Sequence, residues 1–390
     1  MNKLYSTLRG NLRQYVMIIA LVVVIIFFQI VTQGVLLKPL NISNIISQNS
    51  YVLILAIGML LCILTGGNVD LSVGSVAGFV GAVSAVFILK MDMPVIWAIL
   101  ISLAIGIAIG AWQGFWIAYM GVPAFIATLA GMLIFRGLTM VILQGTSLAP
   151  LPAEYTFIAA GFVPDIANIA GINFLAILSG IIATIFYIIG EVKNRNSKKK
   201  YNFEVLPFRM FVLKIAAISL VINAFTYLLS LYKGIPAVLI LVVILVLIYS
   251  FITTKTIPGR HIYAFGGNPK AAKLSGVKTK QVLFWVYVNM GFLAALAGIV
   301  FTGRLNSATP KSGQNFEMDA IASCYIGGAS TSGGVGTVIG AIVGGLLMGI
   351  LNNGMSILGV KIDWQQAIKG FVLLAAVAFD VYSKSKSRTV

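Results

Sequence analysis

The sequence predicts an all-α integral membrane protein with about ten to twelve transmembrane helices, some of them interrupted by glycine. Hydrophobic residues make up 59% of the 390 residues and charged residues only 9%, whereas a soluble domain typically contains about 25% charged residues. The hydrophobic residues are grouped into runs of roughly 20, the length that a helix needs to cross a bilayer. We therefore interpret residues 1–390 as one transmembrane domain.

Twelve apolar runs are predicted to cross the membrane. The first is too long for a signal-peptide core, so we interpret it as a span. Twelve crossings return both termini to the same side of the bilayer. The predicted spans are 15–37, 45–65, 71–90, 95–118, 123–144, 173–190, 215–232, 236–253, 281–303, 318–332, 334–357 and 364–382.

The net charge of +17 predicts a topology and not a nucleic-acid partner. Segments 1–14, 191–214, 255–280 and 384–388 contain nineteen of the twenty-seven lysine and arginine residues, and such residues concentrate in cytoplasmic loops. The loop 145–172 contains none and is expected outside. Both termini are therefore expected in the cytoplasm. We interpret 191–214 as a basic cytoplasmic linker, which fixes the topology beside anionic lipid.

Two glycine-rich breaks interrupt the predicted spans, at 65–74 and 325–336. Irregular backbone is tolerated at membrane depth only where protein covers it or where it lines a water-filled cavity. The breaks also resemble each other, because 73–78 parallels 335–340. An internal repeat would place a transport pathway there, while chance matching of small residues is the alternative. Glycines at four-residue spacing, as in 106–114, predict close helix packing.

Ionisable residues within the spans are costly in lipid and point to function. Asp70 is expected to cap the following helix in preference to contacting a substrate. Arg136 has three interpretations: pairing with Asp70, lining a path, or extending to the interface. The residues expected along a translocation path are Asn68, Asp70, Ser72, Phe125, Thr128 and Arg136.

Aromatic and amide side chains within the apolar runs suit a neutral solute with many hydroxyl groups. The alternative is that they form interfacial belts and helix caps, which is favoured for Trp364 and its neighbours. The residues concerned are Trp112, Gln113, Trp116, Phe125, Thr128, Asn289, Asn352, Asn353, Trp364, Gln365 and Gln366.

The stretch 258–282 is the most water-compatible block of the chain. Asn268 and Pro269 form a typical helix start, and Gly276 a typical stop. We interpret this block as a short cytoplasmic helix that docks a partner. The alternative is a solvated loop whose cations only fix the topology.

Several kinds of chemistry have no residues to support them in this sequence. No G-x-x-x-x-G-K-[ST] phosphate loop is present, so the chain is not expected to bind nucleotide. One histidine and ten acids in no cluster indicate neither an enzyme site nor a metal site. Cys62 and Cys324 lie in apolar runs, which does not suggest a disulfide framework.

Four segments, 65–75, 121–137, 266–276 and 326–337, resemble the signatures of monosaccharide permease subunits of bacterial ABC importers, the ribose, xylose and galactose branch. The resemblance runs in order from about residue 41 to 380 and is closest to the longer xylose or multiple-monosaccharide type. The family break commonly reads Gly-Gly-Ile-Asp-Leu-Ser, whereas Asn68 and Val69 precede the aspartate here.

The resemblance implies an importer of a xylose, galactose, arabinose or ribose type of sugar in the bacterial inner membrane. It implies a homodimer, a separate ATPase that holds the ATP, an extracytoplasmic sugar-binding protein, and no cofactor on this chain. The family core has about ten spans, so 203–252 is expected to be a two-span insertion. A stand-alone secondary transporter or facilitator is the alternative. The residues assigned by resemblance to ATPase coupling are Asn268, Pro269, Ala271, Ala272, Leu274 and Gly276.

Overall fold

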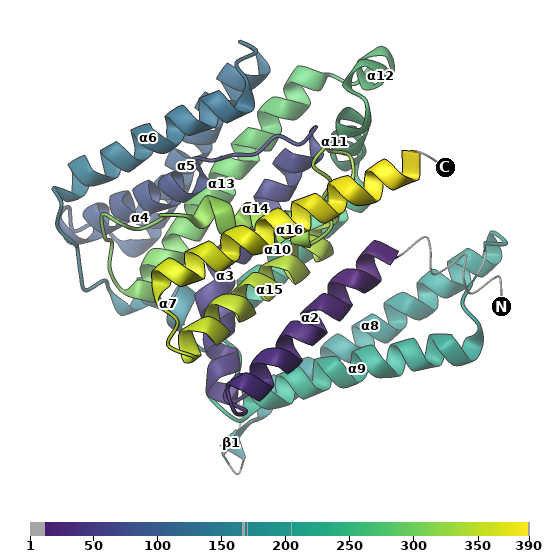
Figure 1. The fold of residues 1–390 in the computed structure, drawn as a ribbon. Helices are drawn as coiled ribbons and strands as arrows, with labels where there is room; N and C mark the ends of the chain where they lie inside the picture. The colour runs from purple at the N-terminus through teal and green to yellow at the C-terminus, as the bar shows by residue number, and fades with distance from the viewer. Residues whose placement is uncertain (1–11, 166–167, 170, 204, 389–390) are drawn as a thin grey trace.

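The computed structural model describes residues 12–165, 168–169, 171–203 and 205–388. Most of this part is helical (Figure 1), which confirms the predicted fold class. The elements are α2 (Leu12–Val31), α3 (Pro39–Leu64), α4 (Val73–Leu89), α5 (Val95–Ala118), α6 (Ala124–Leu143), α7 (Ala153–Ala160), β1 (Asn168–Ile169), β2 (Ile172–Asn173), α8 (Phe174–Lys200), α9 (Phe208–Ser230), α10 (Ala237–Lys255), α11 (Ile257–Gly267), α12 (Pro269–Leu274), α13 (Thr279–Leu305), α14 (Phe316–Ile326), α15 (Val338–Ile357) and α16 (Ile362–Arg388).

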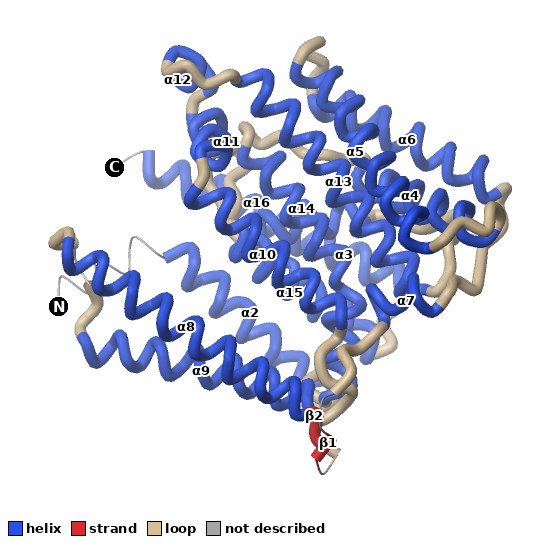
Figure 2. Tube along the Cα trace, turned by 180° about the vertical axis from the view of Figure 1, so that it is seen from behind, coloured by secondary structure: helices blue, strands red, loops and turns tan. Residues whose placement is uncertain are grey.

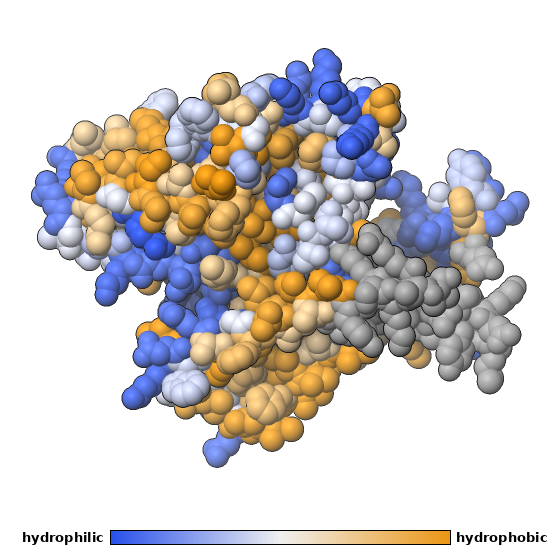
Figure 3. Space-filling model, turned by 45° about the horizontal axis from the view of Figure 1, so that its top comes forward, coloured by the Kyte–Doolittle hydropathy of each residue, from blue (hydrophilic) through white to orange (hydrophobic). Residues whose placement is uncertain are grey.

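The chain turns at two opposite ends of the molecule, which we call the β1 end and the α12 end (Figure 1). At the β1 end, Leu148 bridges Ala308 and Phe162 bridges Pro236, so that loops distant in sequence lie together. The short antiparallel hairpin β1–β2 lies at this end. Hydrophilic side chains gather at the opposite end, where α12 lies, while hydrophobic ones cover much of the face seen in Figure 3.

The centre of the bundle is formed by α3 and α13, with α4, α5 and α15 packed around them. Glycines allow these helices to approach closely. A Cβ atom at Gly106 would lie 2.7 Å from the carbonyl oxygen of Gly291, and one at Gly110 would lie 3.0 Å from the Cα of Gly291. The predicted close packing through four-residue glycine spacing is therefore confirmed at this crossing of α5 and α13.

Among the described residues, eight helices are long and apolar enough to cross a membrane: α3, α5, α6, α8, α9, α10, α13 and α15. The prediction of a span over 318–332 is wrong. Helix α14 has 11 residues and ends at Ile326, which gives it a length of about 16 Å, roughly half of a bilayer core. The reason is local, because Gly327, Gly328 and the serines that follow end the helix.

Segment 191–214, interpreted from the sequence as a basic linker, is largely helical. Helix α8 continues to Lys200 and α9 begins at Phe208. Lysine and arginine favour helix, and contacts between the two helices fix the ends. Lys214 forms an ion pair with Glu191 at 2.8 Å, and the Arg195 guanidinium lies 4.5 Å from the ring centroid of Phe211.

Helices α8 and α9 form a hairpin that lies apart from α4, α5 and α6 (Figures 1 and 2). The stretch 203–252, expected to be a two-span insertion, comprises α9 and α10. Helix α10, however, packs against α3 and α11 of the main bundle. The pair that lies apart is thus α8 and α9.

Candidate transport and coupling site

Helix α12 begins and ends where the sequence predicts. The side chain of Asn268 accepts a hydrogen bond from the Ala271 N–H at 3.0 Å, and Pro269 occupies the first helical position. Gly276 has φ +84°, a left-handed conformation that glycine adopts without strain. The preceding helix α11 was not predicted, although Thr256 accepts a hydrogen bond from Gly259 N–H at 3.4 Å and Pro258 lies in the first turn.

Helix α12 presents most of its side chains to solvent. Leu274 is 90% exposed, which is unusual for a large apolar side chain at the polar end of a membrane protein. Asn268, Pro269, Ala271 and Gly276 are also exposed. Only Ala272 of the predicted set is buried. The helix therefore has an anchored side and a free side that carries a projecting leucine.

The two glycine-rich breaks meet each other and the end of α11. We call this meeting point, formed by residues 64–67, 266–267 and 331–336, the glycine junction. Gly334 N–H donates to the Leu64 carbonyl at 3.0 Å. A Cβ atom at Gly266 would overlap that same carbonyl oxygen and would lie 2.6 Å from the nitrogen of Gly334. Three backbone segments thus touch with no side chain between them, as expected for irregular backbone covered by protein.

A side-chain hydrogen bond from α11 adds to these backbone contacts. The hydroxyl of Tyr263, in the middle of α11, donates to the Gly336 carbonyl at 2.7 Å. Because α11 leads directly through Asn268 into α12, the exposed helix is connected to both breaks by one short rigid element.

Asp70 lies in the first break and is 2% exposed. Its Oδ1 accepts hydrogen bonds from the N–H and the hydroxyl of Ser72, at 2.8 and 2.6 Å. Ser72 Oγ in turn accepts from Gln113 Nε2 of α5 at 2.6 Å. Asp70 therefore orders the turn that enters α4, and Ser72, not Asp70, is the N-cap residue. Helix α6 passes this network at Gly131, whose Cβ would lie 3.3 Å from that of Ser72.

Among the described residues, no hydrogen bond joins Asn68, Thr128 or Phe125 to the network of Asp70. Asn68 Nδ2 donates to the Thr65 carbonyl at 3.0 Å. Thr128 is fully buried and donates to the Ala124 carbonyl of its own helix, while Phe125 is 55% exposed.

Arg136 and Asp70 were considered as a pair, but no ion pair joins them in the described part of the chain. The positive charge of Arg136 favours the ionised form of the Glu317 carboxyl group in α14.

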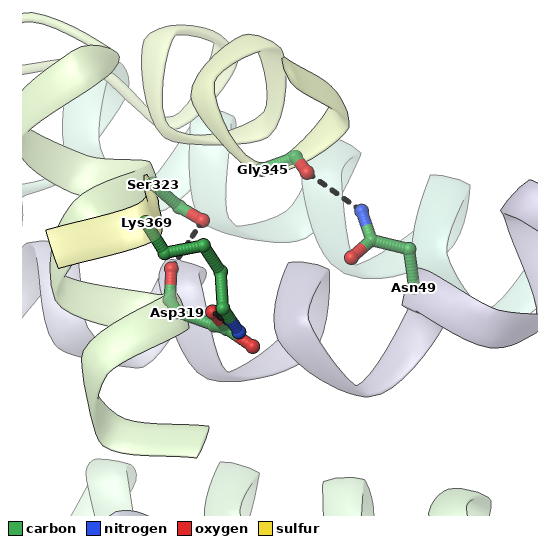
Figure 4. Close-up of polar contacts among 5 residues, drawn as sticks. All are labelled: Asn49, Asp319, Ser323, Gly345 and Lys369. Atoms are coloured by element: carbon green, nitrogen blue, oxygen red, sulfur yellow. Dashed lines mark hydrogen bonds and ion pairs between the residues drawn. The ribbon is translucent and has the colours of Figure 1, made fainter. Parts of the chain in front are cut away.

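Sequence reasoning missed the buried charged residues of α14. Asp319 forms an ion pair with Lys369 of α16 at 2.9 Å (Figure 4). Glu317 is 3% exposed, and its Oε2 has no hydrogen-bond partner among the described residues. The sequence contained a signal for these two acids, because acidic residues in the first turn of a helix are stabilised by the helix dipole. It was overlooked because the predicted span began at residue 318, which left Glu317 outside the span and placed Asp319 at its edge.

Comparison with known proteins identifies the family. The family described as branched-chain amino acid transport system, permease component, matches residues 41–377. The chain belongs to this permease family. The permease is 40% identical to the xylose transport system permease protein XylH of Haemophilus influenzae over 96% of this chain and 98% of that protein.

Two further relatives support the same placement. XylH of Escherichia coli K12 is 37% identical over 97% of the permease and 94% of its own length. The ribose import permease protein RbsC of the same strain is 35% identical over 87% and 85%. No solved structure matches the permease. The resemblance drawn from the four motifs is therefore confirmed, and the permease is a multi-pass membrane protein whose relatives transport and do not catalyse.

Proposed function

We propose that this permease is the membrane-spanning subunit of an ATP-driven importer of xylose or a related monosaccharide. The observation that carries the proposal is the similarity to XylH proteins over nearly the whole length of both chains. The family description names branched-chain amino acids, whereas the relatives compared here are named for sugars. Galactose, arabinose and ribose belong to the same class of substrate.

A separate ATPase is the proposed partner at the α12 end. The sequence contains no phosphate-binding loop, so the nucleotide would bind to another chain. The projecting Leu274 fits an apolar groove, and Lys270 and Lys273 beside it fit acidic side chains around such a groove. In this proposal Asn268, Pro269 and Gly276 fix the ends of the docking helix.

The remaining assembly follows from the same proposal. A sugar-binding protein would dock at the β1 end, outside the cell, and a second copy of the permease would complete a homodimer in the bacterial inner membrane. Both termini would then be cytoplasmic, together with α12. The concentration of basic residues in 1–14, 191–214, 255–280 and 384–388 supports this orientation.

The contacts of α11 suggest how the coupling would operate. Closure of the ATPase dimer would displace α12, and α11 would pass that displacement to the glycine junction. The junction carries the end of α3 and the start of α15, so both helices would move together. The path would then open alternately to the two sides, with no covalent change to the sugar.

A stand-alone secondary transporter is the second candidate, and the buried acids favour it. Asp70, Glu317 and Asp319 are all at least 96% buried, and intramembrane acids are typical of ion-coupled transporters. An imposed proton or sodium gradient would then drive uptake without any ATPase.

Reconstitution in liposomes tests the two candidates. The permease is combined with its ATPase and sugar-binding protein, and uptake of xylose and galactose is measured with and without ATP. We expect uptake that needs all three proteins and ATP. Leu274→Asp should abolish most of it, because a charge would enter the apolar groove. Leu206→Asp, at an exposed leucine in the loop between α8 and α9, is the matched control for the ATPase contact. Uptake by the permease alone would establish the second candidate instead.

A further inference from the structure

A polar cavity of about 150 Å³ lies between α3, α15 and the last turn of α13, on the side of the β1 end. Its polar lining consists of Gln48, Asn49, Tyr51, Arg304, Asn352, Asn353 and Ser356. No aspartate or glutamate is part of the lining. A space of this kind between two membrane-spanning helices is unusual, because interiors are otherwise packed without voids.

Helical spacing creates the cavity. On α15 the lining positions are 349, 352, 353 and 356, which share one face of a helix. Gly349 has no side chain to fill the space. Asn49 of α3 is fixed by donating to the Gly345 carbonyl at 2.6 Å (Figure 4). Asn353 and Asn41 exchange two hydrogen bonds, at 2.9 and 3.0 Å. The walls are therefore held by amides that are already bonded.

Three other polar groups of the lining are not used in this way. Gln48, Arg304 and Asn352 make no side-chain hydrogen bond to other described residues, and Asn352 Oδ1 is buried without a partner. A buried acceptor without a partner is unfavourable. These groups are consequently available to a molecule that enters the cavity.

The size and chemistry of the cavity select a class of ligand. An apolar cavity of about 150 Å³ in another protein accommodates benzene, a six-membered ring. A six-membered ring in this cavity would meet the side-chain amide of Asn352, which both donates and accepts hydrogen bonds. It would also meet the guanidinium of Arg304, whose parallel donors match adjacent hydroxyl oxygens. The Tyr51 ring, 5.1 Å from Phe301 and 4.1 Å from Phe316, gives one side an aromatic wall. A sugar ring with free hydroxyls satisfies all of these groups.

We infer that this cavity is a sugar-binding subsite of the transport path, in which Gln48, Arg304 and Asn352 contact the hydroxyl groups. The inference rests on the proposed function and adds the residues that recognise the substrate. The location of the cavity agrees with a place on the transport path. Helices α3 and α15 line the cavity near the β1 end and meet at the glycine junction near their opposite ends.

Protection from cysteine labelling tests binding directly. Ser356 lies at the exposed mouth of the cavity, and the native Cys62 and Cys324 are buried. In the purified permease, millimolar D-xylose should slow maleimide labelling of Ser356→Cys at least threefold. Ser275→Cys, exposed near the α12 end, should be labelled at an unchanged rate. Equal labelling of Ser356→Cys with and without xylose would overturn the inference, as would protection by xylose phosphate alone.

Transport kinetics provide the second readout. In the complete reconstituted importer, Asn352→Ala and Gln48→Ala should each raise the KM for xylose about five- to tenfold with a smaller change in kcat. Asn223→Ala, in the hairpin α8–α9 away from the cavity, should leave the KM unchanged. If the wild-type importer transports xylose but neither cavity variant changes the KM, the subsite is wrong. If the wild type transports neither xylose nor galactose with ATP, the proposed function itself fails.

Discussion

Helix α3 and the hairpin α8–α9 are equally able to cross a membrane, yet their surroundings differ. In the most apolar window of α3, 83% of the residues are buried inside the protein, against 11% in α8 and 6% in α9. The same apolar character therefore serves two purposes. In α3 it supports contacts with other helices, and in the hairpin it faces lipid.

The difference lies in how each region is held. Helix α3 ends in the glycine junction, where backbone touches backbone and no side chain can be added at Gly266. The hairpin is held by side chains that bond within it, such as Asn223 to Thr184 at 2.8 Å and Lys214 to Glu191. We therefore expect substitutions to be severe at the junction and mild in the hairpin.

The largest effect is expected from Gly266→Ala. The new Cβ would overlap backbone atoms of Leu64 and Gly334, and overpacking against backbone costs about 1–3 kcal/mol or more. The free energy of unfolding should fall accordingly, and xylose uptake should be largely lost. Thermal unfolding of the purified permease in detergent measures the first effect.

The neighbouring residue provides the control. A Cβ at Gly267 would meet nothing within 4 Å, so Gly267→Ala should unfold like the wild type. Equal destabilisation by the two variants would mean that the backbone contact at Gly266 does not set the cost of substitution in the junction.

An intermediate effect is expected from Tyr263→Phe. The variant removes the hydrogen bond to the Gly336 carbonyl, which is worth about 1 kcal/mol, and weakens the connection between α11 and the junction. Sugar uptake per ATP hydrolysed by the reconstituted importer should fall severalfold. Tyr227→Phe, on the exposed face of the hairpin, should leave this ratio unchanged. An unaltered ratio in Tyr263→Phe would mean that α11 does not transmit the movement.

The smallest effect is expected from Asn223→Ala. The variant removes the hydrogen bond to Thr184 within the hairpin, and interhelical hydrogen bonds in membranes are worth about 0.6 kcal/mol. Initial rates of xylose uptake should remain within the error of the wild type. A large loss of transport would show that the hairpin takes part in the mechanism and that the comparison with α3 is too simple.

Local features of the structure were predictable from the sequence. The cap at Asn268, the proline at 269 and the glycine at 276 predicted α12 because their preferences act within a few residues. The breaks at 65–74 and 325–336 were visible because glycine and serine interrupt apolar runs. Non-local features were not predictable. Nothing near Tyr263 indicates that its hydroxyl meets Gly336, 73 positions later.

The charged and polar interior was partly predictable. Asp70 was recognised as an intramembrane acid, but its partner Ser72 makes it a turn-forming residue. Asp319 and Lys369 are 50 positions apart, and pairing across such a distance depends on how α14 and α16 pack. Asn352 and Asn353 were noted for their amides. Their different roles, one bonded to Asn41 and one free in the cavity, depend on the facing helix.

The reciprocal amide bonds between Asn41 and Asn353 have a mechanical consequence. They tie α3 to α15 near the β1 end, while the other end of α15, at Val338, lies beside the junction and packs against α14. Fifteen residues separate Val338 from Asn353, a lever of about 22 Å. A rotation of about 5° around this amide pivot would swing the junction by roughly 2 Å, on the geometry of a straight helix. The molecule would thus be hinged at the β1 end and would open at the α12 end.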